Sequence, residues 1–305
     1  MNLREYLSIA PEVSAALREG KAVVALESTS FSSGELFSEN LAFSAKAEQA
    51  IREQGAIPAT IAILDGVLKV GLSENERERL YKDKNLKKVS RRNLPVMCAL
   101  GKSGATTVAA TMIIASLAGI RVLATGGIGG VHRGADTTMD ISADLQELRK
   151  SSVLVVCAGA TVLSDIGCTL EYLETMGVPV LGLRTARFPM PYCRESGFNV
   201  DCEMQTEMEV ARIAKIKWDL GLTGGVLVAN PVPQEYAMEP CVVEQAMEKG
   251  FAQAQADGIA GKELAAYLRA YIASETGGRS RNVNFHLLRH NACAAARIAL
   301  AYEKL

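Results

Sequence analysis

The chain has 305 residues, of which 49% are hydrophobic and 22% charged, and its formal net charge is -1. This composition is typical of a globular protein with a sizeable core. A nearly neutral chain has no electrostatic footprint for DNA, RNA or an anionic membrane, so we expect none of these partners, and any bound phosphate should lie in a local pocket.

The cysteines and the N-terminus indicate the compartment. The seven cysteines are odd in number and form no CxxC pair, so we expect reduced thiols and no structural zinc. The first residues, MNLREYLSIAPEV, carry charges early and do not fit a signal peptide. The longest apolar run, at 112–118, is too short to span a bilayer. We therefore expect a cytoplasmic protein.

Short β-branched runs alternate with helical segments up to about residue 230, and the chain is helical beyond it, which is typical of an α/β fold. Ser38 and Ser73 are expected to cap helices, and Gly55 and Gly119 to end them. The expected strands are 22–27, 60–64, 122–125, 153–158, 178–183 and 225–229. The expected helices are 39–54, 74–82, 105–118, 142–150, 169–176, 207–220, 241–256, 262–275 and 285–304. No linker or repeat interrupts them, so we expect a single domain over residues 1–305.

Two nucleotide-binding motifs are ruled out by their glycines. Gly101-Lys102-Ser103 ends like a Walker loop, but Val96 stands where that loop needs its first glycine. The segment 125–134 follows a strand, yet its glycines do not match GxGxxG. Five glycines within nine residues there indicate either a surface turn or a backbone that approaches a ligand closely. We favour the ligand, with His132 and Arg133 supplying polar contacts.

Three further groups of polar residues are candidates for a site. Asp140, Ser142 and Asp144 alternate and could either bind a hard cation or form the capped first turn of a helix. The basic segment 88–92 is either a solvated face or a phosphate clamp. Glu27 ends an apolar strand, so it is either the first solvated residue or a general acid or base beside a pocket.

At these residues the sequence resembles the pseudouridine-5'-phosphate glycosidase family, also called indigoidine synthase A-like, from about residue 22 to the C-terminus. The resemblance is specific because its motifs are numerous and collinear. The matching stretches are 24–29 (VALEST), 55–62, 88–92 (KVSRR), 104–109, 124–135, 140–148, 156–160, 171–175, 229–233 and 276–278.

The resemblance implies a metal-dependent lyase or glycosidase that reversibly cleaves the C–C glycosidic bond of pseudouridine 5'-phosphate, giving uracil and ribose 5-phosphate. It also implies an α/β fold, a three-layer α/β/α sandwich around a mixed β-sheet with a helical C-terminal region, assembled as a homotrimer. Glu27 resembles the proton donor, and Asp140 resembles the ligand of Mn²⁺ or Mg²⁺. The expected substrate contacts are Lys88, Val108, His132, Ser142, Ala143, Asp144 and Asn284.

Two positions depart from the family pattern. The family's lysine, which forms an imine with C1' of the sugar, directly follows the Cys-Ala-Gly-Ala segment, where this chain has Thr161. Residues 33–38 read SGELFS where the family has His-Gly-Met-Pro-Phe/Tyr-Pro. The first departure matters chemically, since a carbon leaving group needs an electron sink at C1' and only an amine can form an imine. Lys88 or Lys102 could substitute.

Three hypotheses follow from these departures. The first is a family enzyme that acts on a ribosyl phosphate by way of Lys88 or a different route. The second is an enzyme for an N- or O-linked ribosyl phosphate, in which Glu27 acts as the acid and no lysine is needed. The third is a non-catalytic protein that binds ribosyl phosphate.

Overall fold

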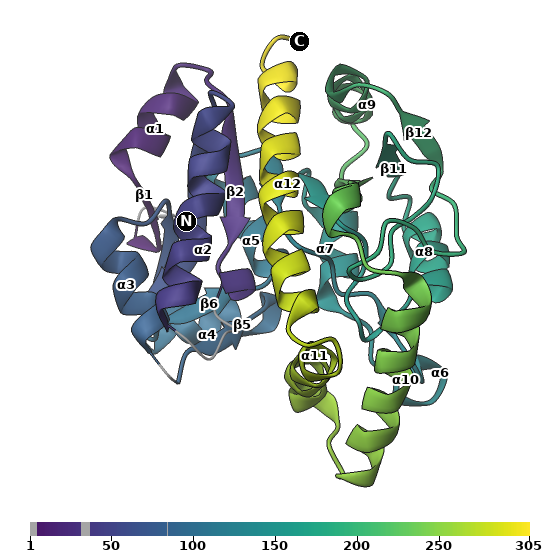
Figure 1. Cartoon of the computed structure of the whole chain (residues 1–305). Coiled ribbons are helices and arrows are strands. Elements are labelled where there is room, and N and C mark those ends of the chain that lie inside the picture. Colours follow the sequence, from purple (N-terminus) through teal and green to yellow (C-terminus); the bar gives the residue numbers. More distant parts are fainter. Residues whose placement is uncertain (1–4, 32–36, 84) are drawn as a thin grey trace.

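A mixed β-sheet forms the centre of the chain in the computed structural model, which describes residues 5–31, 37–83 and 85–305 (Figure 1). The strands lie in the order β1 (Leu7–Ile9), β4 (Val67–Val70), β3 (Ile57–Leu64), β2 (Val23–Glu27), β7 (Val122–Ala124), β9 (Leu154–Cys157), β13 (Val226–Ala229), β11 (Val180–Leu183) and β12 (Cys202–Met204). Strand β6 (Gly104–Thr106) joins β3 to β5 (Lys87–Val89), and β8 (Val131–His132) pairs with β10 (Ser164–Asp165) apart from the main sheet. In this order, neighbouring strands from β3 to β12 pair in parallel, whereas β3 pairs antiparallel with β4 and β6.

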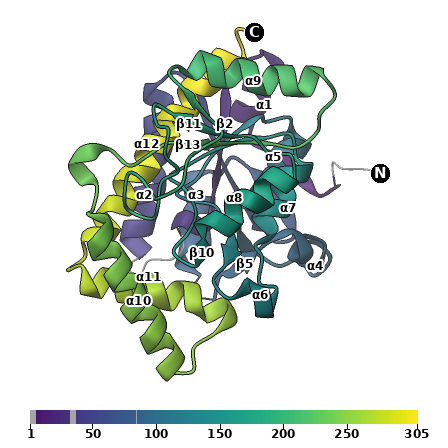
Figure 2. The ribbon, with the colours of Figure 1, turned by 90° about the vertical axis from the view of Figure 1, so that its right-hand side faces the viewer.

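Helices cover both faces of this sheet (Figures 1 and 2). The helices are α1 (Pro11–Arg18), α2 (Phe37–Glu53), α3 (Glu74–Lys82), α4 (Leu94–Ala99), α5 (Val108–Ala118), α6 (Ala135–Thr138), α7 (Ala143–Lys150), α8 (Ile166–Thr175), α9 (Glu207–Asp219), α10 (Pro240–Ala256), α11 (Leu264–Glu275) and α12 (Arg279–Tyr302). Helices α2, α9 and α12 pack on one face, and α1, α5 and α7 on the other. No helix in the described ranges is long and apolar enough to cross a membrane.

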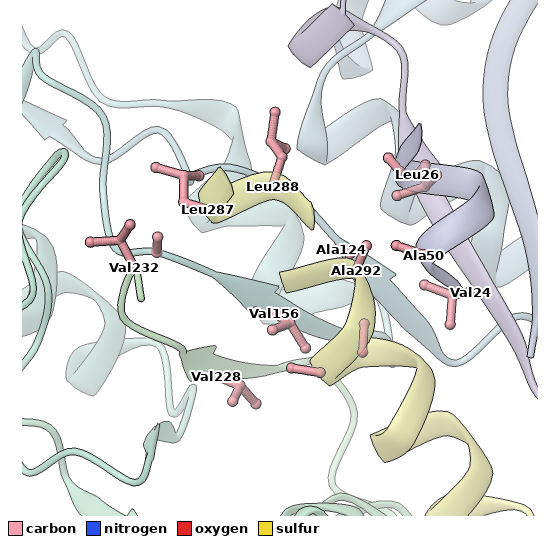
Figure 3. Close-up of a cluster of buried hydrophobic side chains, with 14 of the residues drawn as sticks. Val24, Leu26, Ala50, Ala124, Val156, Val228, Val232, Leu287, Leu288 and Ala292 are labelled. Atoms are coloured by element: carbon pink, nitrogen blue, oxygen red, sulfur yellow. The ribbon is translucent and has the colours of Figure 1, made fainter. Parts of the chain in front are cut away.

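The three layers follow from the alternation of side chains along buried strands. In β2, Val24 and Leu26 face the core under α2 and α12, and Val23 and Ala25 face the core under α1 and α5. Figure 3 shows α12 crossing the first of these faces, with Ala292 close above the strands. Since alanine is small, α12 can pack closely on the sheet.

The expected α/β fold with its three layers, mixed sheet and helical C-terminal region is confirmed. All six expected strands are present, with ends that differ by at most three residues. Helix α3 begins at the expected cap, because the Ser73 hydroxyl accepts from the Glu76 amide in a capping box. Helix α5 ends at Gly119, which adopts the left-handed conformation that favours glycine.

Three expectations about element boundaries are wrong, and several short strands were missed. Helix α2 begins at Phe37, so Ser38 lies inside the helix and does not cap it. Residues 105 and 106 belong to strand β6, and α5 starts only after the cap Thr107. The last helix begins at Arg279, six residues early, because Gly278 turns the chain just before it. The short strands β1, β4, β5, β6, β8, β10 and β12 were not expected.

Candidate active site

A cavity of about 540 Å³ lies at the edge of the sheet where the parallel strands β2, β7 and β9 end. Open α/β sheets place their ligand sites at this edge. Helices α11 and α12 line the opposite side of the cavity through residues that include Ala265, Arg269 and Asn284. The segments that meet here are separated by more than 200 positions in the chain.

Glu27 lies at the end of β2 with its side chain in this cavity, and only 6% of the residue is exposed. Three hydroxyls contact its carboxyl group: Thr29 donates to Oε2 over 2.6 Å, and Ser30 and Thr125 donate to Oε1. Burial raises the pKa of Glu27, and the nearby Asp144 raises it further, although the hydroxyls oppose this change. A buried carboxyl with a raised pKa is suited to hold a proton and donate it.

Asp144 links two segments of the cavity wall through hydrogen bonds to their backbone amides. Its Oδ1 accepts from the Ala109 amide over 2.8 Å, and its Oδ2 accepts from the Gly129 amide over 2.9 Å. Burial raises the pKa of Asp144, while these two amides and the charge of Lys88 oppose the rise. Since both oxygens bind the backbone, Asp144 fixes the start of α5 and the glycine-rich loop relative to α7.

The glycine-rich loop after β7 lines the cavity through Gly126, Gly127 and Gly129, as the ligand hypothesis expects. Neighbouring hydroxyls also require glycine here. A Cβ at Gly129 would lie 2.2 Å from Ser142 Oγ, and one at Gly130 would lie 2.3 Å from Thr169 Oγ1. The loop therefore packs closely against the cap of α7 and against α8.

The basic segment 88–92, considered as either a solvated face or a phosphate clamp, lies only partly in the cavity. Lys88 and Ser90 line the cavity. Arg91 forms an ion pair with Glu147, whose side chain is buried, and lies outside the cavity lining. Among the described residues Lys88 is the one lysine that lines the cavity, whereas Lys102 does not.

Asp140 lies beside the cavity and does not line it. Its Oδ2 is 2.9 Å from Nδ1 of His132, which does line the cavity. The Asp140 side chain is 55% exposed. No group of three or more His, Cys, Asp or Glu in the described ranges could hold a metal. One carboxylate can still serve an ion that keeps most of its waters, as Mg²⁺ does.

The other expected site residues lie as follows. The cavity is lined by Glu27, Lys88, Val108, His132, Ser142, Asp144, Thr161 and Asn284. Ala143, the first residue of α7, is outside the lining, because it starts a helix whose cap, Ser142, faces the cavity instead. Ser142 also accepts a bond from the Asp144 amide, so the capping hypothesis for this segment is confirmed.

Several cavity residues were missed by the sequence analysis. Thr29 and Ser30 were missed as partners of Glu27, although the Ser-Thr-Ser run directly after it was a usable signal. Thr125, a partner of Glu27 that lies outside the lining, was missed as well. Arg269 and Tyr192 also line the cavity. Tyr192 has φ of 65°, an uncommon backbone conformation for a non-glycine residue. No sequence pattern pointed to either of these two residues.

Comparison with known proteins identifies the family. Residues 12–301 match the family described as "Indigoidine synthase A like protein". The chain belongs to the indigoidine synthase A-like family. Among its relatives, the pseudouridine-5'-phosphate glycosidase of Escherichia coli (strain K12) is 52% identical over 99% of this chain and 97% of the relative. The enzyme of the same name from Deinococcus radiodurans is 54% identical, again over 99% and 97%.

Two solved structures share the fold. The prealnumycin C-glycosynthase AlnA, in complex with ribulose 5-phosphate, has a TM-score of 0.91 and 37% identity, and covers 98% of this chain and 97% of its own. An indigoidine synthase A-like protein from Thermotoga maritima has a TM-score of 0.88 and 34% identity over the same shares.

Thr161 is placed in the cavity of this indigoidine synthase A-like chain, where its hydroxyl is 3.4 Å from Ser164 Oγ. Its amide donates to the Ile128 carbonyl over 2.9 Å, so the segment is tied to the glycine-rich loop. Position 161 therefore offers a hydroxyl to the cavity. The second departure, at 33–38, lies mostly outside the described residues, and only 37 and 38 are placed, at the start of α2.

Proposed function

We propose that this protein is a glycosidase that breaks the bond between C1' and the base of a ribosyl 5-phosphate, with Glu27 as the proton donor. The observation that carries the proposal is the buried, hydroxyl-bonded carboxyl of Glu27 in this cavity, where burial raises its pKa. Its relatives are named for pseudouridine 5'-phosphate, which this reaction would split reversibly into uracil and ribose 5-phosphate.

The cavity offers groups suited to the rest of such a substrate. Lys88, His132 and Arg269 are basic residues that line the cavity together with Ser142, and basic side chains and a hydroxyl suit a phosphate. Asn284 offers an amide, which can bond sugar hydroxyls. A volume of about 540 Å³ is in the range of small-molecule sites.

Pseudouridine 5'-phosphate also needs an amine at C1', and Thr161 cannot supply one. Lys88 is the one candidate among the described residues that line the cavity. In that role it would leave the phosphate to His132 and Arg269 and form the imine with C1' that accepts the electrons of the breaking C–C bond. An amine from another segment needs precise placement, so we expect cleavage of this substrate to be slow.

A second function is favoured by the hydroxyl at position 161. An N- or O-linked ribosyl 5-phosphate has a better leaving group, which Glu27 would protonate as the C1' bond breaks. Water would then add to C1' and give ribose 5-phosphate. In the third hypothesis, a protein without turnover, the same cavity would only bind the ribosyl phosphate.

We also propose that Asp140 holds Mn²⁺ or Mg²⁺ by one carboxylate, with water as its other ligands. Such an ion would supply positive charge beside His132. A homotrimer is proposed from the family resemblance alone, and a cytoplasmic location from the unpaired cysteines and the N-terminal sequence. Light scattering after size-exclusion chromatography tests the trimer, since it should give three times the chain mass.

The test is incubation of the protein and Mn²⁺ with a panel of C-, N- and O-linked ribosyl 5-phosphates, followed by mass spectrometry. We expect ribose 5-phosphate from at least one compound. Binding without release from any of them would support the non-catalytic hypothesis and overturn the proposal.

A further inference from the structure

Helix α12 carries one buried amide, Asn291, on the face that packs against the sheet, between apolar residues such as Leu288 and Ala292. A buried amide is destabilising unless it is hydrogen-bonded. Asn291 is fully buried, and its Nδ2 donates to the backbone carbonyl of Thr125 over 2.7 Å. Its Oδ1 accepts from Asn230 Nδ2 over 2.9 Å.

These two bonds join the ends of separate strands. Thr125 follows β7 and Asn230 follows β13, and β9 lies between the two strands. The Asn230 amide nitrogen also lies 3.1 Å from His290 Nδ1, which keeps Asn230 in place. Asn291 thus accepts a hydrogen bond from Asn230 and donates one to the Thr125 carbonyl.

Thr125 needs this support because Gly126 and Gly127 follow it. Glycine restricts the backbone least, so the chain itself does not fix the peptide after Thr125. The Thr125 amide donates to the Val156 carbonyl over 3.0 Å, and its carbonyl is fixed by Asn291. Because the amide and the carbonyl of Thr125 are both hydrogen-bonded, its hydroxyl is directed at Glu27 Oε1.

We propose that Asn291 is a positioning residue for Glu27: it fixes the Thr125 carbonyl so that the Thr125 hydroxyl stays bonded to the Glu27 carboxyl. Asn291 is outside the cavity lining, so it acts through Thr125 and not on the substrate. The catalytic consequence rests on the function proposed above, but the structural linkage does not.

The linkage has a measurable effect on Glu27. The Thr125 hydroxyl opposes the rise in the pKa of Glu27 that burial causes. If Asn291 no longer holds Thr125, this bond weakens and the pKa of Glu27 rises further. The other groups that act on Glu27 stay in place: Asp144 from α7, Tyr81 from α3, and the hydroxyls of Thr29 and Ser30.

The test uses the full chain, labelled with ¹³C in the glutamate carboxyl groups, with the Glu27 signal assigned by Glu27→Gln. We compare the titration midpoint of Glu27 in wild type, Asn291→Leu, Thr125→Val and the double variant. Each single variant should raise the midpoint, and the double variant should raise it no further, because both changes break the same bond.

Ile298→Val is the control, because it loosens an apolar contact of the same helix without touching the amides, and it should leave the midpoint unchanged. An unchanged midpoint in folded Asn291→Leu, or shifts that add in the double variant, would overturn the inference. If Asn291→Leu does not fold, Asn230→Ala releases Asn291 from its other side and should also raise the midpoint. An unchanged Glu27 midpoint in Asn230→Ala would also overturn the inference.

Turnover separates this inference from the proposed function. On a substrate that the wild type cleaves, Asn291→Leu should lower kcat by about tenfold, since a displaced acid transfers its proton poorly. Its affinity for ribose 5-phosphate in calorimetry should not change. If the wild type cleaves nothing, the proposed function fails, and the midpoint of Glu27 still decides whether Asn291 positions it.

Discussion

At the scale of single residues, the proposed chemistry depends on Glu27 and on the residue at position 161. Both were named as candidates from the sequence, because each lies within or beside a long family motif. The Thr125 hydroxyl beside Glu27 and the bond from Asn291 to Thr125 were not predicted. They join residues far apart in the chain, which no local pattern specifies.

Replacing Glu27 by glutamine should lower kcat by about 10²- to 10⁴-fold, the usual contribution of a general acid, with ribose 5-phosphate still bound.

The stability of the protein should also depend on pH through Glu27. The pKa of Glu27 is higher in the folded protein than in the unfolded chain. Its contribution to stability is therefore fully present below the unfolded pKa and is lost as the pH rises through the folded pKa. Glu27→Gln should flatten the fall in melting temperature as the pH rises above 4.5, the ordinary pKa of the group. Parallel melting curves would contradict the raised pKa.

Thr161→Lys should supply the amine that the proposed imine chemistry requires. Thr161 lines the cavity, so a lysine there would bring its amine into it. We expect faster cleavage of pseudouridine 5'-phosphate and a borohydride-trapped ribose 5-phosphate adduct at position 161. The change at 33–38 should keep the rescue partial. Thr161→Met, similar in length but without an amine, is the control. A wild-type adduct on Lys88 or Lys102 would show that the nucleophile has moved to another segment.

At the scale of elements, the glycine-rich loop is the part most sensitive to added volume. Gly129→Ala would place a methyl group 2.2 Å from Ser142 Oγ and 3.0 Å from Asp144 Oδ2. We expect a loss of about 1–3 kcal/mol in the free energy of unfolding, together with weaker ligand binding. Gly197→Ala is the matched control, since nothing lies within 4 Å of its added Cβ. Equal stability of the two variants in denaturant titrations would contradict the close approach.

The turn before α7 carries the metal prediction. Asp140→Ala should abolish Mn²⁺ binding in calorimetry, because Asp140 is the one protein carboxylate that we assign to the ion. Asp136→Ala removes an exposed carboxylate four residues away, in α6, and should bind Mn²⁺ as the wild type does. If the affinity of Asp140→Ala is undiminished, the ligands lie elsewhere.

At this scale, elements with strong periodicity or clear end signals were predictable from the sequence, among them β2, β9 and α3. The three-residue strands β5 and β6 were not predicted. They are too short for alternation to be visible, and they are strands because β6 pairs with β3 and β5 pairs with β6. Lys88 lies in one of them, so its approach to the cavity could not be argued from local structure.

At the scale of the whole molecule, the sheet brings its strand ends to one edge, and α11 and α12 close the cavity over them. The α/β alternation predicted the layers. It did not predict that the helices after residue 230 would complete the site, because no pattern in those helices specifies which side of the sheet edge they cover.

The central claim is that this cavity presents C1' of a ribosyl 5-phosphate to Glu27. A crystal structure of the wild type with ribose 5-phosphate tests it most directly. The account predicts C1' beside the Glu27 carboxyl and Thr161, with the phosphate toward Lys88 and His132. A sugar bound outside this cavity, or bound with C1' remote from Glu27, would contradict it.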